Sequence, residues 1–280
     1  MRPHFYAFLA GLAAACAFQP LGLWPLMPAA LALLLYLVEE APGLRSALAR
    51  GWWFGFGHFA LGLNWIATAF TYQSEMPAWL GWVAVVLLSL YLAVYPALAA
   101  GVAWRWGKGN PLRLTLVLAA AWIATEWLRA SMFTGFAWNP AGVALLPTPL
   151  SRVATLVGTY GLSGVTMLVA GVLLLLTHRA WRSAAAVGAL LAASTFLASA
   201  LSPPAPGRLG IAIRILQPNI GQQDKWRPDF LRESIARLQR LSARGTGEPR
   251  LLLWPEAAVT RPLEIGLADP FAQLEAAGVR

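Results

Sequence analysis

Seven apolar stretches dominate the first two hundred residues of the chain, each bounded by Gly, Pro or charged positions. A helix that crosses a bilayer needs about 20 apolar residues, and a few more or fewer when it is tilted. The stretches that approach this length are 5–19, 24–38, 51–70, 78–103, 112–130, 154–177 and 182–201. The first two are short and separated by Gln19-Pro20. We interpret them as two spans rather than one broken hairpin, so the pattern predicts about seven transmembrane helices.

The pattern changes after residue 201. A stiff linker at 202–208, rich in proline, is followed by alternating apolar positions at 209–215, which predict a strand. Residues 229–243 have the periodicity of an amphipathic helix, the run 251–254 predicts a buried strand, and 269–278 carries the start and stop signals of another helix. The order β-α-β-α in some seventy residues is too little for an α/β core of its own. The domains are therefore expected at 1–201 and 209–280, the second one truncated.

Composition supports a membrane protein with a polar end. The chain is 58% hydrophobic and 12% charged, whereas average soluble domains are about a quarter charged. Eight of its twelve acidic residues lie at or after position 208. The net charge of +9 does not indicate nucleic-acid binding, because the basic residues of the first part sit in short loops between apolar runs. The single cysteine, Cys16, excludes an intrachain disulfide.

The loop arginines and lysines predict an orientation. With the N-terminus inside, eight basic residues fall in inner segments and two in outer ones; the inner ones are Arg2, Arg45, Arg50, Arg105, Lys108, Arg113, Arg179 and Arg182. The outer two are Arg129 and Arg152. Cytoplasmic loops carry such an excess. An odd number of crossings then places everything after Leu201 outside the cytoplasm.

Glu256 is the strongest candidate for chemistry. It follows a buried apolar run, Leu251 to Trp254, and functional groups in α/β sheets gather at the carboxyl ends of strands. A carboxylate beside Trp254 and Pro255 is partly desolvated, which raises its pKa and suits a general base. A solvated carboxylate at a strand end is the alternative.

Polar residues within the apolar stretches are few. Glu126 lies in the last turn of the fifth span, where a local ion pair with Arg129 is a plainer explanation than a functional role. His58, near Gly55 and Gly57, favours helix packing over ligation, and three scattered histidines with one cysteine form no metal-ligand pattern. The outer loop 131–153 is too apolar for a solvated linker and is expected at the membrane surface.

Several motifs, taken together and in order, resemble one family along essentially the whole chain. Leu253-Trp254-Pro255-Glu256 resembles the glutamate motif of the nitrilase superfamily. The stretch Ile215–Ile220 with Lys225-Trp226 resembles the first strand and loop of its membrane branch, the apolipoprotein N-acyltransferases. Gly62-Leu63-Asn64-Trp65, Thr125–Arg129 and Thr134–Trp138 are similar to further stretches of that family.

The resemblance implies a fold and an activity. The fold is a membrane all-α bundle followed by the start of a nitrilase-like α/β domain. In the family a Glu-Lys-Cys triad takes an acyl chain from a phospholipid as a thioester and passes it to the α-amine of a lipoprotein's diacylglyceryl cysteine. Carried over by position, Glu256 is the general base, and Trp226 and Trp138 belong to substrate-binding regions; for Trp226 a plain packing role is the alternative. No cofactor is implied. The expected location is the bacterial inner membrane, with the soluble part on the periplasmic side.

The family's lysine and cysteine belong to later strands that this sequence does not contain. Lys225 precedes Glu256 and does not match that lysine, and Cys16 lies in the first span. We therefore expect a fragment that is inactive by itself. The competing interpretation is a non-catalytic membrane protein that binds lipid or acts as a scaffold, with a vestigial nitrilase-like segment.

Overall fold

The computed structural model describes residues 2–72, 76–202, 210, 212–221, 224, 230–243 and 250–255. By its internal contacts the chain divides into two units, Met1–Ser202 and Pro203–Arg280.

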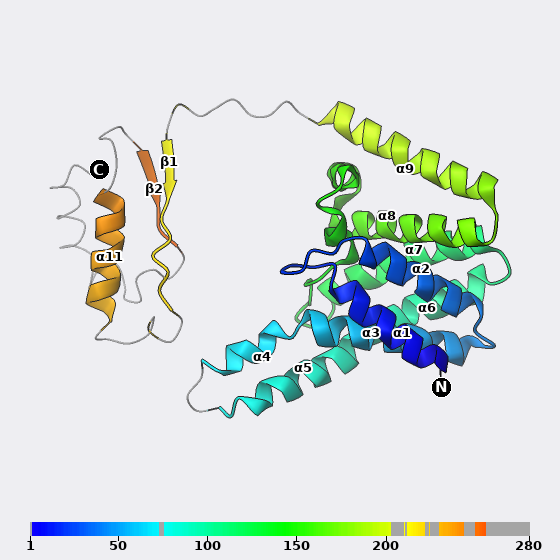
Figure 1. The fold of residues 1–280 in the computed structure, drawn as a ribbon, viewed down its shortest axis with the longest axis horizontal. Coiled ribbons are helices and arrows are strands. Elements are labelled where there is room, and N and C mark those ends of the chain that lie inside the picture. The colour runs from blue at the N-terminus through cyan, green and yellow to red at the C-terminus, as the bar shows by residue number, and fades with distance from the viewer. Residues whose placement is uncertain are drawn as a thin grey trace. The chain divides into compact units, whose positions relative to one another are not determined.

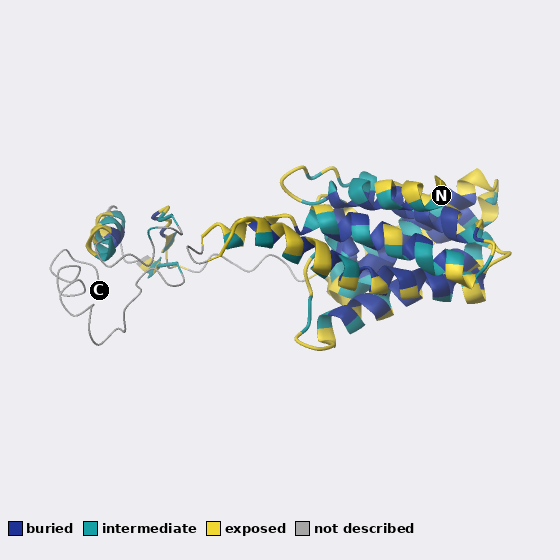
Figure 2. Ribbon diagram, turned by 90° about the horizontal axis from the view of Figure 1, so that it is seen from below, coloured by how far each residue is buried: buried dark blue, intermediate teal, exposed yellow. Residues whose placement is uncertain are grey.

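The first unit is a bundle of α-helices with two short 3₁₀ helices (Figure 1). Its elements are α1 Arg2–Ala15, α2 Leu26–Glu39, α3 Leu44–Gly62, α4 Trp65–Phe70, α5 Trp79–Leu92, α6 Val94–Gly107, α7 Pro111–Ser131, η1 Ala141–Leu145, η2 Pro149–Val153, α8 Ala154–Thr177 and α9 Trp181–Leu201. Buried residues gather where these helices face one another (Figure 2). The first two apolar stretches form separate helices, α1 and α2, and α2 is a short apolar helix.

Two of the predicted spans are each divided in the structure. The stretch 51–70 is interrupted at Leu63 and Asn64, so α3 ends before the short helix α4 begins. The stretch 78–103 is divided at Ala93 into α5 and α6. Pro96 has no N–H to donate to the Leu92 carbonyl, as a helix continuous through Ala93 would require, so the helix divides there. The arm formed by α4 and α5 projects beyond the neighbouring helices (Figure 1).

Four helices in the described part are long and apolar enough to cross a bilayer. They are Trp79–Gly107, taken as one, Pro111–Ser131, Pro149–Thr177 and Trp181–Leu201. Helix α2 is apolar but has 14 residues, which gives about 21 Å against a hydrocarbon core of about 30 Å. At 29 residues, the Trp79–Gly107 segment is about 43 Å long and exceeds that thickness. These helices make the chain an integral membrane protein.

Helices α1 and α3 approach each other closely through glycines. A Cβ added at Gly11 would lie 2.0 Å from the Phe54 carbonyl oxygen, and one at Gly57 would lie 2.4 Å from that of Phe8. Small residues at such positions let membrane helices pack backbone against backbone. Gly11 and Gly57 therefore serve the packing of α1 against α3.

Replacement of Gly11 by alanine is expected to destabilise the bundle by about 1–3 kcal/mol, because the added methyl group meets backbone that cannot move aside. Thermal unfolding of the detergent-solubilised protein, followed by tryptophan fluorescence, measures the effect. Gly188→Ala on α9 is the matched control, since its Cβ would meet nothing within 4 Å. Equal melting temperatures for the two variants would contradict the packing.

The second unit contains a parallel β-α-β arrangement. Strand β1 (Ala212–Ile215) pairs with β2 (Arg250–Leu253) in the register Ala212↔Arg250, and helix α11 (Leu231–Ala243) lies between them in sequence. The predicted strands and the amphipathic helix are confirmed. Fully buried Leu238 lies on the apolar side of α11.

The strand predicted at 251–254 is present, but the prediction that it is buried is wrong. Ile213, Ile215, Leu251 and Leu253, which share one face of the sheet, are all exposed. In the described residues the sheet has two strands, and a strand is buried on both faces only where other elements cover both. The helix predicted at 269–278 lies outside the described residues.

Candidate functional site

A buried carboxylate lies near the C-terminal end of α7. Glu126 is 5% exposed, and its Oε1 accepts hydrogen bonds from the indole N–H of Trp122 at 2.9 Å and from the backbone N–H of Ala141 at 2.8 Å. Ser163 of α8 also faces this carboxylate, and its hydroxyl accepts the N–H of Gly142 at 2.9 Å. Glu126 and Ser163 therefore fasten η1 to α7 and α8.

The ion pair expected between Glu126 and Arg129 is not formed at short range in the described part of the chain. Arg129 is 3% exposed, and its Nη1 donates to the Trp138 carbonyl at 2.6 Å. Its guanidinium also lies 5.1 Å from the centre of the Phe59 ring. The spacing of three residues suggested a local pair. In the structure the two side chains bond to backbone groups of the segment after α7 instead: Arg129 donates to the Trp138 carbonyl, and Glu126 accepts from the Ala141 N–H.

The segment 136–142 is held by several such bonds, and it presents Trp138 outward. Asn139, in a left-handed conformation at φ 54°, donates from Nδ2 to the Gly62 carbonyl at 3.1 Å. The Trp138 indole is 60% exposed and packs edge-on against Trp65 of α4, with ring centres 5.6 Å apart. Trp138 therefore stands on a fixed backbone. The loop 131–153 was expected at the membrane surface, but its part at η1 returns into the bundle, where Ala141, Ala144 and Leu145 are buried.

His58 packs among aromatic rings, in agreement with its predicted role. It is 4% exposed and stacks on Phe54 with an interplanar angle of 9°. Its Nδ1 and Glu126 Oε2 are buried without a hydrogen-bond partner in the described part of the chain. Both residues line a cavity of about 10 Å³, which is near the smallest volume that holds one water molecule. Arg129 and Asn139 line the same cavity, together with Tyr95, Trp122 and Thr125.

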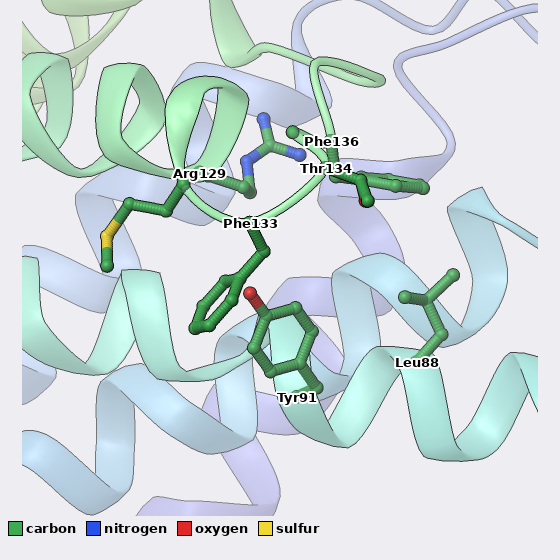
Figure 3. Close-up of a pocket in the computed structure, with 8 residues that line it drawn as sticks. Leu88, Tyr91, Arg129, Phe133, Thr134 and Phe136 are labelled. Atoms are coloured by element: carbon green, nitrogen blue, oxygen red, sulfur yellow. The ribbon is translucent and has the colours of Figure 1, made fainter.

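Arg129 also lines a larger pocket of about 320 Å³ (Figure 3). Its lining residues are Leu88, Tyr91, Arg129, Met132, Phe133, Thr134, Gly135 and Phe136. Leu88 and Tyr91 rise from α5, while the others come from the end of α7 and the turn that follows, with the Arg129 guanidinium turned toward that turn (Figure 3). The pocket is thus an apolar hollow with one cation in its wall.

The turn that closes this pocket is built by two left-handed residues. Gly135 has φ 75°, and a Cβ there would lie 2.4 Å from the Ala130 carbonyl oxygen, so the position requires glycine. The chain then returns onto the helix, where the Phe136 N–H donates to the Arg129 carbonyl at 2.8 Å. Phe133 has φ 57° and is 83% exposed. Sequence reasoning missed this pocket; Gly135 was its one visible signal, because Leu88 and Tyr91 come from a distant part of the chain.

In the second unit the strand β2 ends at Leu253. The Leu216 N–H donates to the Leu253 carbonyl at 3.0 Å, and the Trp254 indole donates to Ser242 Oγ at 3.1 Å. Glu256 and Trp226 lie outside the described residues. Cys16 follows α1, where its thiol donates to the Leu12 carbonyl at 3.4 Å. No group of residues able to hold a metal is found in the described ranges.

Comparison with known proteins finds similarity to one family along most of the chain. A family model of the apolipoprotein N-acyltransferase N-terminal domain matches residues 10–172. The chain is 36% identical over 94% of its length to an apolipoprotein N-acyltransferase of Ralstonia nicotianae, covering 51% of that protein. It is 32% identical over 91% of its length to one of Shewanella oneidensis and 34% identical over 92% to one of Brucella suis, covering 50% and 52% of those proteins. The chain thus spans about half the length of the curated relatives it matches.

Proposed function

The chain belongs to the apolipoprotein N-acyltransferase family, and on that premise we propose that the whole protein transfers an acyl chain from a phospholipid to a lipoprotein. The acceptor is the α-amine of the diacylglyceryl cysteine. The observation that carries the proposal is the match of the family model to residues 10–172, extended by relatives aligned over nine-tenths of the chain. In this proposal the chain supplies the membrane half and Glu256.

The chemistry proceeds in two balanced steps. A cysteine thiolate attacks the ester carbonyl of the phospholipid, so that a thioester forms and a lysophospholipid leaves with a proton. The lipoprotein amine then attacks the thioester, an amide forms and the thiol is regenerated. Glu256 accepts the thiol proton, which makes the nucleophile. Cys16 is not the nucleophile in this scheme, since it follows α1 in the bundle and its thiol donates to Leu12.

The bundle brings the reaction to its lipid substrates, which reside in the bilayer. We propose seven crossings, formed by α1, α2, α3 with α4, α5 with α6, α7, α8 and α9, with the segment after Leu201 on the periplasmic side. The charge distribution supports this orientation more strongly once burial is considered. Arg129, counted as an outer charge, is buried, and so is Arg50 among the inner ones, where it donates to the Leu37 carbonyl. Without these two buried residues, seven basic residues lie in inner segments and one lies in an outer segment.

N-acylation of a diacylglyceryl-cysteine peptide tests the proposal. The complete protein, encoded by the full reading frame that contains this chain, is incubated with a phospholipid donor, and the triacylated peptide is detected by mass spectrometry. Triacylated product is expected from the complete protein, and none from the 280-residue chain alone. Failure of the complete protein to acylate the peptide with any donor phospholipid would contradict the function.

A further inference from the structure

We propose that the small cavity lined by His58 and Glu126 holds one water molecule, which hydrogen-bonds to Nδ1 of His58 and to Oε2 of Glu126. The water joins α3 to the hydrogen bonds by which Glu126 holds η1. The site is formed by described residues of the first unit. It goes beyond the proposed acyl transfer and does not depend on it.

Two buried polar atoms of this cavity have no hydrogen-bond partner in the described part of the chain. They are Nδ1 of His58, on α3, and Oε2 of Glu126, on α7. The two residues are 4% and 5% exposed, and both line the cavity. Because each atom lacks a partner, the two side chains do not bond to each other. A buried polar group left unsatisfied costs free energy, and ordered water satisfies such groups where the protein offers no partner.

The chemistry of the two atoms favours water over an ion. A carboxylate oxygen accepts hydrogen bonds, whereas a nitrogen of a neutral imidazole donates or accepts according to the tautomer. Water both donates and accepts, so it satisfies Glu126 Oε2 together with either tautomer of His58. A metal ion fits less well, because Arg129 lines the same cavity and is 3% exposed. A second positive charge close to that buried cation would be repelled.

The size of the cavity fits a single water molecule. Its volume of about 10 Å³ is close to the about 10–15 Å³ that one water requires. A buried water typically makes about three hydrogen bonds, and Thr125, Arg129 and Asn139 bring further hydrogen-bonding groups to the wall. The backbone of Asn139 also faces the His58 ring. The cavity is therefore polar enough to keep one water and too small for a larger ligand.

Hydroxyl-radical footprinting with X-rays tests the site on the detergent-solubilised 280-residue protein. Radicals formed from a bound water oxidise the side chains around it, and peptide mass spectrometry measures the rate of oxidation at each residue. Trp122 lines the cavity, whereas Met167 of α8 is fully buried and is not among its lining residues. Trp122 is expected to be oxidised about fivefold faster than Met167 or more, because only Trp122 borders a cavity that holds water.

Two variants of nearly equal size show whether His58 holds the water. His58→Asn keeps a polar atom near the place of Nδ1, so Trp122 oxidation is expected to stay within about twofold of the unmodified protein. His58→Leu removes that atom, so Trp122 oxidation is expected to fall about fivefold or more, because an apolar cavity stays dry. Equal rates of Trp122 oxidation in the unmodified protein and in folded His58→Leu would overturn the inference.

The unmodified protein decides the question even if His58→Leu does not fold, which its thermal unfolding curve reveals. Trp122 oxidised no faster than Met167 in the unmodified protein would show that the cavity is dry, and this result also overturns the inference.

Discussion

Replacement of Glu256 by glutamine in the complete protein is expected to lower the rate of N-acylation by about 10²–10⁴-fold, the contribution of a positioned general base. The amide has nearly the same shape as the carboxylate but cannot accept the thiol proton. The thiolate population falls accordingly, because a free thiol with a pKa near 8.5 is mostly protonated at neutral pH. Initial rates of triacylated-peptide formation measure the loss.

The matched control is Glu233→Gln on α11. Glu233 is a surface carboxylate paired with Arg237 at 3.1 Å, one helical turn away, and such pairs contribute about 0.3–0.5 kcal/mol. Its replacement is expected to leave the rate within twofold. If Glu256→Gln acylates the peptide as fast as Glu233→Gln does, Glu256 is not the base.

Replacement of Glu126 by alanine is expected to destabilise the membrane bundle by about 3–5 kcal/mol, the cost of removing one partner from a buried charged network. The change leaves the indole N–H of Trp122 and the backbone N–H of Ala141 without their acceptor. It also leaves Arg129 buried without its nearby negative charge. Thermal unfolding in detergent, followed by tryptophan fluorescence, reports the change in stability.

Two further variants make the Glu126 result specific. Glu126→Gln keeps one oxygen for the Trp122 and Ala141 donors, so it is expected to lose much less stability than Glu126→Ala. Glu39→Ala removes a carboxylate of the same bundle that binds His178 at 2.8 Å in a partly exposed pair, and it is expected to cost about 1 kcal/mol or less. A Glu126→Ala protein that unfolds at the same temperature as Glu39→Ala would show that the network contributes little.

The sequence located the helices well because each is marked locally. Apolar runs bounded by charges and prolines predicted 112–130, 154–177 and 182–201, and the structure has helices at Pro111–Ser131, Ala154–Thr177 and Trp181–Leu201. The interruption at Leu63 and Asn64 carried no such mark. There Asn139, 77 residues further along the chain, donates to the Gly62 carbonyl at the end of α3, and hydropathy does not report a contact of that range.

The candidate site was predictable only in part for the same reason. Glu126 was recognisable as an acid inside a span, but its partner Ala141 comes from a segment whose return into the bundle depends on Ser163 and Asn139. Burial of the second strand was overestimated, because an apolar run does not reveal whether a covering element is present. Glu256 was singled out by its place after a strand, and β2 does end three residues before it.

We propose that the segment after Leu201 stands on the periplasmic side of the membrane. Paired fusions of alkaline phosphatase, active only outside the cytoplasm, and of a fluorescent protein that folds inside, are made after residue 207 and, as the opposite control, after Lys108. This orientation predicts phosphatase activity without fluorescence after residue 207 and the reverse after Lys108. Fluorescence without phosphatase activity after residue 207 would contradict it.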